Sequence, residues 1–187
     1  MNELLQSPYI PWTIGVLLLL LLWLLYRFVR ARGSKLDQVL RDIAYERVND
    51  LVIPNGDDGE ILIDQLLLTS QGLLILEVKD VEGAVFGSDK MQDWTVISAD
   101  RRYTFSNPQH GLYDRIAAVR HIVRQVPVAG RVLFLDGAEF SKGMPGLVAT
   151  LDLLQKEFGE KNKKSASKKV EAFMPYWELI SRRAKAE

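Results

Sequence analysis

Two apolar runs of strand length, residues 61–68 and 73–78, place the strongest constraint on the fold of this chain. They are separated by residues 69–72 (TSQG), which are turn-forming types, so together they predict an antiparallel hairpin. Apolar residues lie on both faces of each run, which is typical of strands inside a sheet. We therefore expect the hairpin in the interior of a sheet, within an α/β fold.

Three charged residues accompany these runs: Asp64 in the first, and Glu77 and Lys79 in the second. Glu77 and Lys79 are two residues apart, so they share one strand face at a spacing of about 6.6 Å. A turn with an even number of residues, centred on 70–71, would place Asp64 opposite Glu77. A three-residue loop with a bulge at Gly72 would shift the register by one and turn Asp64 away.

Two directly opposed carboxylates repel each other and destabilise a sheet. A divalent cation between them removes that repulsion, because Mg²⁺ prefers carboxylate and carbonyl oxygens. Lys79 would then place a positive charge beside an attacking water or a phosphate in its transition state. The pattern predicts a site that binds Mg²⁺ (or Mn²⁺) together with a phosphate group of a substrate. The alternative for these three residues is a solvated ion pair across two surface strands.

The residues around the hairpin also resemble the nuclease-related domain (NERD) family, which is grouped with the PD-(D/E)xK nucleases. The resemblance covers roughly residues 40–135. The matching positions are Ile63-Asp64, residues 66–69 (LLLT), Gly72-Leu73, residues 76–79 (LEVK), Gly83, Gly87, Trp94 and Asn107-Pro108. This resemblance implies an αβββαβ restriction-endonuclease-like core.

By the same resemblance, Asp64, Glu77 and the main-chain carbonyl of Val78 would be metal ligands, and Lys79 would be the catalytic lysine. Two further positions correspond to accessory residues of the family site, and both depart from its pattern. Glu46 follows a tyrosine where the family usually has a glycine, and the glutamine at 109 lies closer to the Asn-Pro pair than is usual.

The N-terminal part of the chain is different in character, because no charged side chain occurs between Glu3 and Arg27. Arginine and lysine residues follow this stretch. The pattern predicts a short N-terminal segment (1–10) and a single transmembrane helix (11–29). Because basic residues flank the cytoplasmic end of such helices, we expect a cell-membrane protein with its C-terminal domain in the cytoplasm.

The remainder divides into a NERD-like domain at 34–158 and a basic linker with a helical tail at 159–187. The domain is predicted to begin with a helix that ends near Asp50, and to contain an amphipathic helix at 112–126. Together with the charge pattern, the resemblance predicts a membrane-anchored phosphodiesterase (nuclease) that uses Mg²⁺ (or Mn²⁺) and acts on nucleic acid. An alternative function is a catalytically inactive nuclease-like domain, tethered at the membrane, that binds nucleic acid or protein. A third is an assembly factor whose tail helix docks a partner through Phe173, Trp177 and Ile180. The sequence names no protein partner and no oligomeric state.

Overall fold

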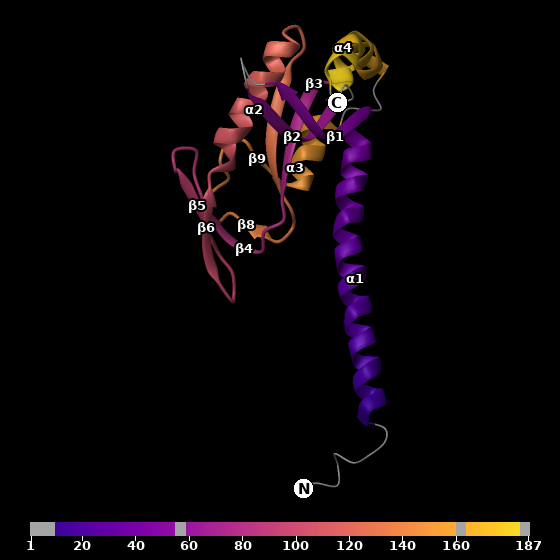
Figure 1. Ribbon diagram of the computed structural model, residues 1–187, viewed down its shortest axis with the longest axis vertical. Helices are drawn as coiled ribbons and strands as arrows, with labels where there is room; N and C mark the ends of the chain where they lie inside the picture. Colours follow the sequence, from indigo (N-terminus) through magenta and orange to yellow (C-terminus); the bar gives the residue numbers. More distant parts are fainter. Residues whose placement is uncertain (1–9, 55–58, 160–163, 184–187) are drawn as a thin grey trace. The chain divides into compact units, whose positions relative to one another are not determined.

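The computed structural model describes residues 10–54, 59–159 and 164–183 of the chain (Figure 1). It contains both helices and β-strands, so the predicted mixed α/β class is confirmed. In chain order the elements are α1 (Ile10–Ile43), β1 (Glu46–Pro54), β2 (Glu60–Thr69), β3 (Gly72–Lys79), β4 (Gly83–Phe86), β5 (Asp93–Ile97), β6 (Arg102–Ser106), α2 (Pro108–Ile122), β7 (Val128–Phe134), β8 (Ala138–Glu139), β9 (Val148–Ala149), α3 (Leu151–Phe158) and α4 (Lys164–Arg183).

The chain forms two compact units, one up to Gln38 and one from Val39 onward. The first unit contains most of α1. Among the described residues, no helix is both long enough and apolar enough to cross a lipid bilayer. The prediction of a transmembrane helix at 11–29 is contradicted by this finding.

The larger sheet of the second unit has the strand order β1-β2-β3-β7-β9. Strands β1, β2 and β3 are antiparallel neighbours, and β7 runs parallel to β3. The hairpin of β2 and β3 closes through a two-residue turn, because Thr69 lies opposite Gly72. Both strands are interior, as the sequence predicts.

Helices cover both faces of this sheet. Gly130 of β7 faces α2, since an added Cβ would lie 2.7 Å from a methyl group of Ile116. The next residue, Arg131, contacts Glu157 of α3 through an Nε–Oε2 hydrogen bond of 3.0 Å. Successive side chains of a strand point to opposite faces, so α2 and α3 lie on opposite sides of the sheet. This explains why both faces of β3 are apolar.

A second, smaller sheet has the order β6-β5-β4-β8 and lies at one end of the first (Figure 1). Its strands β4, β5 and β6 are inserted between β3 and α2. Trp94 of β5 is fully buried and stacks on Phe134 at the end of β7, with ring centroids 6.2 Å apart. This aromatic contact joins the two sheets into one core.

The predicted helix to Asp50 is wrong, because α1 ends at Ile43 and residues 46–54 form β1. Without the insertion of β4 to β6, the order α1, β1, β2, β3, α2, β7 reads α, β, β, β, α, β. A helix in the tail is confirmed as α4. Trp177 and Ile180 of α4 are buried in the core of the domain, so they do not form a free docking face.

Candidate functional site

The three predicted site residues lie where β2 and β3 stop pairing. The register pairs Leu68 with Leu73 and Leu66 with Ile75, and it ends with Gln65 opposite Leu76. The next residue on each strand is Asp64 on β2 and Glu77 on β3. The turn therefore has the even length that the sequence analysis needed to bring these two positions together.

Asp64 is half-buried at the point where β2 leaves β3. Among the described residues, no hydrogen-bond donor or cation pairs with its carboxylate. A half-buried carboxylate of this kind retains all its lone pairs for an added ligand. This differs from Glu77, which has two cationic neighbours.

The main-chain carbonyl of Val78 points to the same gap. Leu135 donates its N–H to the carbonyl of Lys79 at 3.1 Å, so that carbonyl lies on the β7 side of β3. Successive carbonyl groups of a strand point to opposite edges, which puts the Val78 carbonyl on the β2 side. The β2–β3 ladder has already ended there, so the Val78 carbonyl is not part of it.

Glu77 and Lys79 form a close ion pair on one face of β3. The Nζ of Lys79 lies 2.7 Å from Oε1 of Glu77. The Glu77 side chain is 10% exposed and the Lys79 side chain 34%, so the carboxylate is enclosed while the ammonium group borders solvent. A charge-assisted contact of this length fixes the Lys79 amine in position.

A third residue, Arg115 of α2, completes the cluster and was not among the predicted site residues. Its Nη1 lies 3.5 Å from Oε2 of Glu77. Its Nε–H donates to the carbonyl of Leu62 on β2 at 2.7 Å. Arg115 thus spans the two diverging strands. One weak signal for Arg115 is present in the sequence, since Gly111, one helical turn earlier, leaves open the space beside the guanidinium group.

The two predicted accessory residues lie elsewhere. Glu46 is exposed at the start of β1, opposite Leu68, and not on the first helix. Gln109 is buried in the first turn of α2. Its side chain donates to Asp89 and accepts from the N–H of Leu147. The structure therefore does not bring either residue into the cluster around Glu77.

The donor atoms at the gap are two carboxylates and one main-chain carbonyl. No group of three or more histidine, cysteine, aspartate or glutamate side chains suited to a metal ion occurs in the described part of the chain. Oxygen donors of this kind fit a hard divalent cation that completes its coordination with water and phosphate, as Mg²⁺ does. They do not fit a zinc site, which takes nitrogen and sulfur ligands.

Comparison with protein families decides the identity of this domain. The model of the nuclease-related domain family matches residues 30–135, which is more than half of the 187 residues. The chain belongs to the NERD family. The match includes the whole cluster of Asp64, Glu77, Lys79 and Arg115, so the NERD domain of this chain contains both the gap and the residues around it.

The NERD chain is 32% identical over 99 residues to the uncharacterized protein pXO1-01 of Bacillus anthracis. The aligned part is 53% of this chain and 45% of the relative, so the chain spans less than half of that protein's length. No solved structure matches the chain.

Proposed function

We propose that this NERD domain is a metal-dependent phosphodiesterase that cleaves nucleic acid. One observation carries the proposal: the Lys79 amine is held 2.7 Å from Glu77, and Asp64 takes the next position of the neighbouring strand. Membership of a nuclease-related family supports the same chemistry. The half-exposed amine leaves room for a substrate to reach the cluster from solvent.

In this proposal Asp64, Glu77 and the Val78 carbonyl hold one Mg²⁺ or Mn²⁺ ion. When bound, such an ion polarises the phosphate and lowers the pKa of a coordinated water. Lys79 donates hydrogen bonds from its ammonium group to the attacking water or to a phosphate oxygen, and it offsets negative charge there. Glu77 keeps the amine in place for this role.

The direct test is cleavage of DNA and RNA by the full chain with Mg²⁺ or Mn²⁺. We expect cleavage by the wild type and none by Lys79→Ala. That variant should stay folded, because Arg115 still pairs with Glu77 and Lys79 borders solvent. Lys90→Ala, which removes an exposed lysine, is the matched control and should cleave like the wild type.

Equal cleavage by wild type and Lys79→Ala would mean that a contaminant cuts the substrate. If no variant cuts but the wild type binds nucleic acid, the domain is the non-catalytic binding module that the sequence also allowed.

Metal binding is tested separately by thermal melting. We expect Mg²⁺ or Mn²⁺ to raise the melting temperature of the wild type, because a ligand that binds only the folded state stabilises it. Asp64→Asn should remove this shift, and Asp100→Asn, which changes an exposed loop residue, should retain it. An unchanged shift in Asp64→Asn would place the ion at a different site.

A further inference from the structure

Arg115 links the two strands that diverge at the candidate site. Its Nε–H donates to the Leu62 carbonyl, two residues before Asp64, and its Nη1 pairs with Glu77. The guanidinium group is therefore held against both β2 and β3. The side chain is 23% exposed, so part of its donor set still borders solvent. A planar group with five N–H donors, held this way, suits bidentate contact with phosphate.

The charges of the cluster also favour binding of phosphate. Asp64 and Glu77 contribute two negative charges, and Lys79 and Arg115 contribute two positive charges, so their sum is zero. A divalent cation alone would leave the cluster with a net charge of about +2, which opposes its binding. Two phosphodiester groups would restore neutrality. The cluster therefore favours the cation and the nucleic acid together over either one alone.

We propose that Arg115 is a phosphate-binding residue that couples the binding of nucleic acid to that of the divalent ion. This inference rests on the proposed function, because it uses the same site. Without nucleic acid, Arg115 pairs with Glu77 and competes with the cation for that carboxylate. With nucleic acid, its guanidinium group contacts a phosphate, and Glu77 becomes available to the cation.

Gly111 provides a second way to change the contact between Arg115 and Glu77. A Cβ at residue 111 would lie 3.0 Å from Nη1 of Arg115, which is the far end of a flexible side chain. At this distance the guanidinium group must shift by a few tenths of an ångström, so Gly111→Ala perturbs its contact with Glu77 and leaves every charge in place. Alanine also favours the helix, so this variant is expected to fold.

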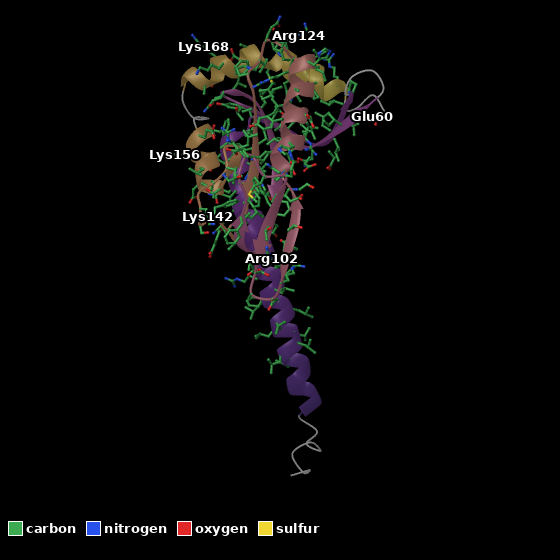
Figure 2. All side chains as sticks on the ribbon, turned by 90° about the vertical axis from the view of Figure 1, so that its left-hand side faces the viewer. Glu60, Arg102, Arg124, Lys142, Lys156 and Lys168 are labelled. Atoms are coloured by element: carbon green, nitrogen blue, oxygen red, sulfur yellow. The ribbon has the colours of Figure 1, made fainter. Side chains whose placement is uncertain are left out.

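The test uses the full chain and measures two affinities. Mg²⁺ binding is followed by thermal melting without nucleic acid. Binding of short fluorescent DNA, single- and double-stranded, is followed by anisotropy with and without Mg²⁺, and with Ca²⁺ where cleavage interferes. The variants are Arg115→Gln and, as the matched control, Arg124→Gln. Arg124 is an exposed arginine just after α2, at the top of the view in Figure 2.

We expect Mg²⁺ to tighten DNA binding by the wild type, and by linkage DNA tightens Mg²⁺ binding by the same factor. Arg115→Gln should bind Mg²⁺ alone about threefold more tightly or better, since one positive charge is gone. Its DNA affinity in Mg²⁺ should fall roughly tenfold, which is the loss of one charge-assisted contact. The coupling factor should shrink. Gly111→Ala should also bind Mg²⁺ alone more tightly.

The inference is overturned if Arg115→Gln changes DNA affinity no more than Arg124→Gln does. It is also overturned if neither Arg115→Gln nor Gly111→Ala binds Mg²⁺ more tightly, or if the wild type binds neither ligand. Cleavage is scored independently: coupling without cleavage would remove the phosphodiesterase proposal and leave the role of Arg115. Cleavage by the wild type, with equal DNA and Mg²⁺ affinities in Arg115→Gln and Arg124→Gln, would retain the phosphodiesterase proposal and remove the role of Arg115.

Discussion

Gln109 donates from Nε2 to Oδ1 of Asp89 at 3.1 Å, which joins the first turn of α2 to the loop between β4 and β5. Its Oε1 accepts the N–H of Leu147 at 2.9 Å, next to β9. Asp89 in turn accepts the N–H of Gly146 at 2.8 Å. These three contacts connect the inserted sheet, α2 and the end of the larger sheet. The side-chain nitrogen and oxygen of Gln109 therefore both make structural hydrogen bonds, and its accessory role in the site stays a prediction.

Gln109→Ala should destabilise the domain by about 1–3 kcal/mol, because it removes two partly buried hydrogen bonds and leaves the Leu147 N–H without its acceptor. Urea unfolding measures the change. Gln92→Ala, which truncates an exposed glutamine, should cost less than about 0.5 kcal/mol. Equal losses of unfolding free energy in the two variants would mean that the hydrogen bonds of Gln109 do not hold these elements together.

The same network predicts a pH dependence. The N–H of Gly146 and the side chain of Gln109 hold the pKa of Asp89 below its ordinary value of 3.8. Since the pKa is lower in the folded state, the ionised carboxylate contributes stability above pH 3.8. This contribution is lost as the pH falls through the lower folded value.

Asp89→Asn removes this titration, so the variant should be less stable than the wild type at neutral pH, and the difference should shrink as the pH falls below 3.8. Urea midpoints at neutral and acidic pH measure it. Asp93→Asn, at the exposed start of β5, is the control for the loss of one surface charge. A gap between Asp89→Asn and wild type that stays constant with pH would contradict the assignment.

The hairpin could be predicted because its information is local. Two apolar runs and a turn between Thr69 and Gly72 fix the pairing, and the pairing carries Asp64 to the position beside Glu77. Because side chains alternate between the two faces of a strand, this pairing also determines which side chains share a face. The confirmed register follows from these few residues alone.

Strand β1 was missed because Val39, Ile43 and Val48 continue an apparent helical spacing, with no proline or glycine between them to mark a break. Tertiary pairing with β2 overrides that local pattern. Arg115 was missed for a different reason. Its partner Glu77 is 38 residues away, and a single arginine on a helix carries no local sign of such a contact.

The packing of Trp94 gives a third prediction. A Cβ at Gly87 would lie 2.3 Å from Cδ2 of the buried indole ring, which is rigid and also donates to the carbonyl of Ser88. Gly87→Ala should therefore destabilise the domain by about 1–3 kcal/mol through overpacking. Urea unfolding measures the loss of stability, and the near-UV circular dichroism of the folded variant reports a displaced aromatic ring.

Gly146→Ala is the matched control for Gly87, because a Cβ there would lie 3.7 Å from Asp89, an ordinary contact. We expect little change in that variant. Equal stability of the two alanine variants would mean that the indole ring does not lie against residue 87.

The last prediction concerns Gly72, which closes the hairpin and sets its register. Its φ is +125°, and a Cβ there would lie 2.2 Å from the carbonyl oxygen of Pro127. Gly72→Ala is therefore strained twice, once by its backbone and once by this contact with a carbonyl that also accepts the N–H of Leu73. We expect a loss of roughly 2–4 kcal/mol in urea unfolding.

Gly143→Ala separates the two causes. Gly143 has a φ of +91° but no atom within 4 Å of an added Cβ, so only the backbone strain remains, at about 1 kcal/mol. The difference between the two variants measures how closely the hairpin turn approaches Pro127. If Gly72→Ala loses no more stability than Gly143→Ala, the hairpin turn does not lie against the carbonyl of Pro127. Asp64 would then lose the register that places it beside Glu77, and the candidate metal site would lose one of its two carboxylates.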